Sequence, residues 1–182
     1  MAIPQINTTP VDDRSEKNIQ TLLPGVQILA RSLVHAAAAN SIDIKVISGT
    51  RTYAQQHALY LQGRSPLDVV NAARAKASMD PITEKENQHE VTPCDEGHSN
   101  HNFQIAFDIG IFESTNYIAE SPLYKAVAIL GKQLGLTWGG DWHSFQDEPH
   151  YELRPYWAKD LSETAMLDEL RQRTDSGKSL FA

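Results

Sequence analysis

The sequence has few of the features that would place it in an unusual class of protein. Its single cysteine, Cys94, cannot form an internal disulfide, so we expect the chain to fold in a reducing compartment. Basic residues are not in excess: 23 acidic side chains outnumber 16 Lys and Arg, and the formal charge of −7 argues against nucleic acid or anionic lipid as a partner. No apolar run approaches the roughly 20 residues that cross a bilayer, and no repeat is visible. The remaining composition is that of an ordinary globular protein with a buried core.

The length of 182 residues suits one domain, and we expect 1–182 to form it. Within it we expect an irregular arm at 1–14, a surface excursion at 65–98, and a C-terminal extension with a helix at 154–182. The N-terminus lacks the basic and then apolar pattern of a secretory signal, which predicts synthesis in the cytoplasm without a signal peptide and no membrane insertion. A monomer is expected.

Hydrophobic spacing and turn residues predict alternating helices and short strands. Helices are predicted over 15–39 with a break at Pro24 and Gly25, and then over 52–62, 121–135 and about 162–173. Strands are predicted over 42–48, 104–112 and 150–153. Paired glycines and Pro149 predict a loop between the helix over 121–135 and the strand over 150–153. The first part of the excursion at 65–98 could form a helix, whereas the rest is polar and rich in turn residues.

Two junctions between predicted elements carry side chains that can bind a metal ion. His101 and Asp108 flank a loop-to-strand transition, and Asp147 and His150 lie around the turn that follows the tryptophans. A catalytic zinc needs three ligands from His or carboxylate, an open position for water, and a separate group to take the proton of that water. His101, Asp108 and His150 can supply the ligands, with Asp147 as the base. Since His150 lies 42 residues after Asp108, only the tertiary fold can assemble such a site.

Each of these residues also has a structural interpretation. His101 and Asp108 could form a capping or core-edge pair, and Asp147 could cap the turn before Pro149. A second possible zinc site is formed by His89, Cys94 and His98 together with His101. Large aromatics beside paired glycines favour core packing for Trp138, while Trp142 is left open between packing and substrate contact.

Three blocks of sequence resemble the motifs of the VanY-like zinc peptidases. SNHNFQIAFD at 99–108 resembles S-x-H-x-x-G-x-A-x-D, and the segment from WGGDW to DEPHY at 138–151 resembles W-G-G-x-W…D-x-P-H-[FY]. SGTRT at 48–52, with the Gln, Leu-Tyr and Gly-Arg positions that follow, resembles S-G-x-R-[ST]…Q…L-Y…G-R. The blocks cover about residues 15 to 153 in the family's order. Within the family they are similar to phage L-alanyl-D-glutamate endopeptidases, which are endolysins that cut the stem peptide of peptidoglycan.

The resemblance implies an α+β fold of the hedgehog/D-Ala-D-Ala-peptidase type, with a small antiparallel sheet that bears the zinc site and helices packed on one side. It also implies roles for eight residues: Zn²⁺ bound by His101, Asp108 and His150; catalysis by Asp147 and Arg51; and substrate binding by Gln56, Ser99 and Trp142. The alternative interpretations are a surface cation for Arg51 and a solvated helix residue for Gln56. One position departs from the motif, because Gln104 stands where the family has Gly. The close backbone approach that Gly permits must then be made differently, or the adjoining strand shifts.

The expected function is therefore a zinc-dependent peptidoglycan endopeptidase that hydrolyses the L-alanyl-D-glutamate bond. A D,D- or L,D-carboxypeptidase with the same site is the nearer alternative, and a catalytically silent, zinc-stabilised binding module is the more distant one. Only about 29 residues follow Leu153, too few for the separate wall-binding domain of some endolysins. Action on the cell wall is expected after release through a separate pore.

Overall fold

The computed structural model describes residues 4–143 and 145–182, and the chain divides into two compact units. The first unit comprises Met1–Thr50 and Gln104–Pro155, and the second comprises Arg51–Phe103 and Tyr156–Ala182. Residues 1–3 of the expected N-terminal arm lie outside the described residues. The single domain expected over 1–182 stays a prediction.

The first unit is built on a five-stranded sheet in which every pairing is antiparallel. The order is β1 (Ile44–Ser48), β2 (Ala106–Glu113), β5 (His150–Glu152) and β4 (Thr137–Trp138), and β3 (Asn116–Ile118) also pairs with β2. The predicted small antiparallel sheet is therefore confirmed. Strands β3 and β4 were not predicted, because segments of three and two residues are too short to show an alternating pattern.

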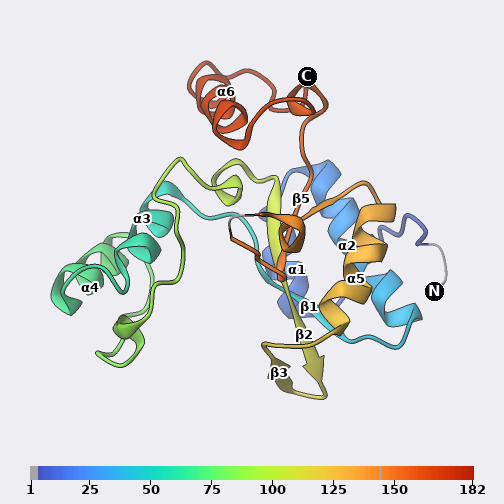
Figure 1. Ribbon diagram of the computed structural model, residues 1–182, viewed down its shortest axis with the longest axis horizontal. Coiled ribbons are helices and arrows are strands. Elements are labelled where there is room, and N and C mark those ends of the chain that lie inside the picture. The colour runs from blue at the N-terminus through green and yellow to red at the C-terminus, as the bar shows by residue number, and fades with distance from the viewer. Residues whose placement is uncertain (1–3, 144) are drawn as a thin grey trace. The chain divides into compact units, whose positions relative to one another are not determined.

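Three helices belong to this unit: α1 (Asp13–Ile19), α2 (Pro24–Ala39) and α5 (Leu123–Gln133). Pro24 begins α2, so the predicted break separates α1 from α2. Helices α2 and α5 contact each other and lie side by side along the sheet (Figure 1). Each buries an apolar stripe at helical spacing, which includes Val26, Ala30 and Leu33 on α2 and Tyr124, Val127 and Leu130 on α5. The predicted α+β class is confirmed.

Helix α1 closes the outer edge of the sheet. The Ser15 hydroxyl accepts a hydrogen bond from the backbone N–H of Val46 on β1 at 2.9 Å, and the Asn18 amide donates to the Val46 carbonyl at 2.8 Å. An edge strand left open would be a template for aggregation, so these two bonds protect β1. A Cβ at Gly49 would lie only 2.4 Å from the Asn18 carbonyl oxygen. The glycine of the SGTRT block is thus required for close packing against α1.

The second unit is mainly helical. Its helices are α3 (Tyr53–Leu61), α4 (Leu67–Lys76) and α6 (Glu163–Asp175), with short 3-10 turns at η1 (Glu86–Gln88), η2 (Asn100–Phe103) and η4 (Tyr156–Ala158). Helices α3 and α4 pack against each other (Figure 1), so the excursion at 65–98 begins with a helix. Among the described residues, no helix combines the length and the apolar character needed to span a membrane.

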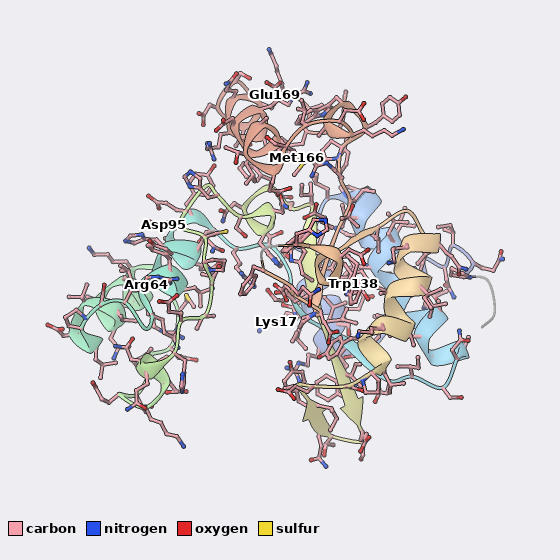
Figure 2. All side chains as sticks on the ribbon, in the orientation of Figure 1. Lys17, Arg64, Asp95, Trp138, Met166 and Glu169 are labelled. Atoms are coloured by element: carbon pink, nitrogen blue, oxygen red, sulfur yellow. The ribbon has the colours of Figure 1, made fainter. Side chains whose placement is uncertain are left out.

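The Gly-Arg pair after α3 fixes the end of that helix. Gly63 has a φ of +78°, and a Cβ there would lie 2.5 Å from the backbone nitrogen of Glu90. Arg64, labelled in Figure 2, donates to the carbonyls of Tyr60 at 2.7 Å and Thr92 at 2.9 Å. These two motif positions therefore join α3 to the polar segment of the excursion, a structural task rather than a chemical one.

The position where the motif departs from Gly has left-handed backbone geometry. Gln104, between η2 and β2, has a φ of +62°. Its carbonyl accepts a hydrogen bond from the Leu23 N–H at 3.1 Å, which ties the turn to the start of α2. The left-handed region is unfavourable for residues with a Cβ. The turn that Gly normally makes is thus retained by Gln at a conformational cost.

We predict that Gln104→Gly stabilises the protein by about 0.5 to 1 kcal/mol, measured by urea unfolding. Glycine avoids the left-handed cost of about 1 to 2 kcal/mol, which outweighs the extra freedom of about 0.4 to 1 kcal/mol that it gives the unfolded chain. Gln104→Ala, which keeps the Cβ, is the control and should show no such gain. A glycine variant no more stable than the alanine variant would contradict the assignment of strain to this residue.

Candidate metal centre

One face of the sheet carries the polar residues of β2 and β5. Side chains on a strand alternate between faces, and Phe107 and Ile109 are fully buried on the side that also takes Tyr151, whose ring stacks on Phe107 with centroids 5.8 Å apart. Asp108 and His150, each offset by one residue from those positions, face the opposite way. They are also direct partners in the register of β2 and β5. The sheet therefore sets a carboxylate beside an imidazole.

The His150 ring lies between two carboxylates. Its Nδ1 is 3.3 Å from Oδ1 of Asp108, and its Nε2 is 3.1 Å from Oε2 of Glu152. The exposed fractions of the three side chains are 5%, 13% and 1%. Burial by itself lowers the pKa of His150, but the hydrogen bonds and charges of Asp108 and Glu152 outweigh it and raise the pKa to about 10. An imidazole in this position holds a cation strongly, whether a proton or a metal ion.

Glu152 was missed in the sequence analysis. It is fully buried, which is rare for a glutamate without a charged partner. The signal was present, because Glu152 lies two positions after His150 on a predicted strand, and a period of two places both on one face.

Hydrogen bonds between the WGG segment and the DEPH segment hold the loop before β5 in place. The Trp138 indole N–H, in the side chain labelled in Figure 2, donates to the Glu148 carbonyl at 2.7 Å. The Asp147 N–H donates to the Gly139 carbonyl at 3.1 Å, and the His150 N–H donates to the Asp147 carbonyl at 3.2 Å. A Cβ at Gly139 would lie 2.6 Å from the Asp147 carbonyl oxygen. Trp138 is buried, so its predicted packing role is confirmed, and Asp147 is fixed three residues before His150.

Trp142 follows η3 (Gly139–Asp141) and lies against the predicted ligand of β5. The centroids of the Trp142 and His150 rings are 4.8 Å apart, with 46° between their planes. The Trp142 side chain is half-buried, so part of the indole covers the imidazole and part faces outward. Its substrate-binding role stays a prediction.

In the second unit, Arg51, Ser99 and His101 belong to one backbone network. The Arg51 N–H donates to the His101 carbonyl at 3.1 Å, and the Asn102 side chain donates to the Arg51 carbonyl at 2.9 Å. Asn102 also accepts from the Gly97 N–H at 3.0 Å, and its own N–H donates to the Ser99 carbonyl at 2.9 Å. Sequence reasoning missed Asn102, because the motif leaves its position open. Through Asn102 the predicted ligand His101 and the predicted catalytic Arg51 are held together.

The environment of Gln56 is not that of a solvated helix residue. It is fully buried on α3, and its amide donates to the Thr92 hydroxyl at 3.2 Å and the Cys94 carbonyl at 2.7 Å. These bonds fasten the polar segment of the excursion to the helix. A buried amide reaches a substrate only if that segment moves, and the substrate-binding role of Gln56 stays a prediction.

Among the described residues, one group of His, Cys and acidic side chains can hold a metal ion: His101, Asp108 and His150. Each offers one ligand atom, and the three atoms lie within 4.8 Å of one another. Two imidazoles and one carboxylate are a donor set that suits a catalytic zinc. The rival set of His89, Cys94 and His98 does not form such a group in the described part of the chain.

The chain is similar to known proteins. A family model described as D-alanyl-D-alanine carboxypeptidase matches residues 94–153, a range that includes all three candidate ligands and Asp147. The peptidoglycan L-alanyl-D-glutamate endopeptidase CwlK of Bacillus subtilis (strain 168) is 32% identical over 144 residues, which are 74% of this chain and 74% of that protein.

One solved structure shows a similar fold, and a second match is weaker. The L-Ala D-Glu endopeptidase ChiX of Serratia marcescens matches 81% of this chain and 92% of its own, with 19% identity and a TM-score of 0.51. The vancomycin-resistance D,D-pentapeptidase VanY of a VanB-type cassette, in complex with Zn(II), matches 87% of this chain and 81% of its own. Its identity is 17% and its TM-score is 0.48.

The raised pKa of His150 predicts how the stability of the metal-free protein depends on pH. Because folding raises this pKa from 6.5 to about 10, the stability it contributes is fully present below pH 6.5 and is lost as the pH rises through 10. Urea midpoints measured with a chelator present should therefore fall between pH 7 and pH 10. His150→Gln, which cannot hold this proton, is the control, and an equal fall in that variant would show that other groups are responsible.

Proposed function

Because the chain belongs to the VanY-like zinc peptidase family, we propose that it is a zinc-dependent endopeptidase that hydrolyses the L-alanyl-D-glutamate bond of the peptidoglycan stem peptide. At the coarser level the chain is a metallopeptidase that acts on peptidoglycan. The choice of bond is supported by CwlK, the relative of 32% identity, which is named as a peptidoglycan L-alanyl-D-glutamate endopeptidase. The observation that carries the proposal is the pairing of Asp108 with His150 on the polar face of the sheet.

The donor set supports zinc as the metal. A zinc ion held by His101, Asp108 and His150 would supply Lewis acidity, which polarises a peptide carbonyl and acidifies a water molecule. The ligands contribute one negative charge in total, so the centre keeps a net positive charge. Their low exposure limits competition from bulk water.

Asp147 is the proposed general base. Its carboxylate would accept a proton from the attacking water and return it to the departing amine. Two hydrogen bonds fix the backbone of Asp147. Its N–H donates to the Gly139 carbonyl, and its carbonyl accepts from the N–H of His150. A base that must act within hydrogen-bond reach of the reacting water benefits from such a rigid turn.

Arg51 is proposed to hold substrate oxygens. Its guanidinium offers a planar fork of N–H donors for a developing oxyanion or a substrate carboxylate, and losing one oxyanion donor typically costs about 3 kcal/mol. Its backbone is anchored to His101 and Asn102, so the side chain starts from a fixed point. Ser99, Gln56 and Trp142 are proposed to contribute to substrate binding.

Digestion of purified peptidoglycan tests the scissile bond. We expect mass spectrometry to find peptides that begin with D-glutamate, with L-alanine left on the glycan, and we expect no products when a chelator is present. Release of a single C-terminal residue from short stem peptides would instead identify a carboxypeptidase. Cleavage that continues at the same rate with all metal removed would contradict the metallopeptidase mechanism.

Asp147→Asn separates catalysis from binding. The variant should keep its metal and its fold but lose about 100-fold or more in hydrolysis rate, because the amide cannot accept the proton. Glu148→Gln, a neighbouring change without an assigned role, is the matched control and should remain active. Full activity of Asp147→Asn would remove this residue from the mechanism. Metal binding without hydrolysis in the unaltered chain would identify a binding module.

A further inference from the structure

Glu152 is a buried carboxylate to which neither the motifs nor the proposed mechanism gives a role. It lies in the middle of the sheet, where it pairs in register with Ala106 on β2 and Thr137 on β4. Its exposed fraction is 0%. An ionised carboxylate in such a place is costly unless charged or hydrogen-bonding groups compensate it. A residue retained there under that cost should contribute something that an apolar side chain cannot.

The contacts of Glu152 point to the candidate ligand His150. One oxygen, Oε2, is 3.1 Å from Nε2 of His150, and the other, Oε1, is 4.0 Å from Nη1 of Arg154. The opposite ring nitrogen of His150, Nδ1, faces Asp108. The two nitrogens of the ring are therefore assigned to two different carboxylates, one of which belongs to the candidate metal group and one of which does not.

We propose that Glu152 is a positioning residue of the metal centre, which accepts the Nε2–H of His150 and so turns the Nδ1 lone pair toward the metal position beside Asp108. This inference rests on the proposed function, since it takes His150 to be a ligand. A neutral imidazole carries one N–H, and the carboxylate on Nε2 selects the tautomer in which Nδ1 carries the lone pair that can bind a metal ion. The carboxylate also makes the ring a stronger donor to a cation.

The orientation of β5 makes the arrangement rigid. His150 and Glu152 are two residues apart on a strand whose intervening residue, Tyr151, is locked into the core against Phe107 and Gly131. A Cβ at Gly131 would lie 2.5 Å from the Tyr151 ring, so this glycine permits the close approach. With Tyr151 fixed, the two polar side chains cannot rotate about the strand independently. The distance between the ring and its partner is thus set by the core.

Zinc affinity tests the inference, measured by competition with a chromophoric chelator on the full chain. Glu152→Ala should weaken zinc binding by about 10- to 100-fold, the usual effect of removing such a partner. Glu152→Gln keeps an oxygen acceptor of the same reach and should recover most of the loss. An affinity of Glu152→Ala equal to that of the unaltered chain would overturn the inference.

Glu16→Ala is the matched control for losing a buried carboxylate. Glu16 lies in the same unit and accepts two hydrogen bonds from Arg31, each at 2.8 Å. Its loss should lower the urea midpoint of the metal-free protein and leave zinc affinity unchanged. If Glu152→Ala behaves in the same way, the role of Glu152 is only structural and the inference fails.

A spectroscopic measurement covers the case in which Glu152→Ala does not fold. Long-range ¹H–¹⁵N spectra of the unaltered, zinc-loaded chain should find the proton of His150 on Nε2 and the metal on Nδ1, and a proton on Nδ1 would overturn the inference. If the unaltered chain binds no zinc, the proposed function fails together with this inference. If it binds zinc and cleaves peptidoglycan while Glu152→Ala binds equally well, only the inference fails.

Discussion

The antiparallel pairing of β2 with β5 is the constraint on which the site depends. The register sets Asp108 opposite His150, and the two-residue period of the strands directs both away from the face covered by helices. A slip of one residue would send these side chains into the apolar layer and bring Phe107 and Tyr151 to the polar face. The stacking of Phe107 on Tyr151 on the apolar face therefore stabilises the register that places Asp108 and His150 on the polar face.

Several residues in and beside the motifs fix the backbone around the candidate site. Gly49 allows β1 to approach α1, Gly139 allows the Asp147 turn to approach η3, and Trp138 binds the carbonyl of Glu148. Asn102 links Arg51 to the η2 turn that carries His101. A catalytic group is useful only when its position is fixed within a fraction of an ångström, so much of a motif is devoted to scaffolding.

The polar face concentrates charged side chains around the His150 ring. Asp108 and Glu152 both lie within hydrogen-bonding range of the His150 ring, and both are nearly inaccessible to water. In a region of low dielectric such a cluster is stable only with a balancing cation, which the protonated imidazole supplies in the metal-free chain and a metal ion supplies in the loaded one. The same electrostatic arrangement thus explains the raised pKa of His150 and the capacity to bind metal.

The sequence by itself determined the helices other than α4, the three main strands and the candidate ligands, because periodicity, capping residues and motif spacing are local properties. It did not reveal β3 and β4, which are too short to carry a pattern, or the left-handed turn that Gln104 adopts in place of glycine. Only the tertiary structure decided that Gln56 is buried against Thr92 and Cys94, and that Asn102 joins Arg51 to His101. Those relations join segments that are distant in the chain, and packing and hydrogen bonding establish them only when the whole core has formed.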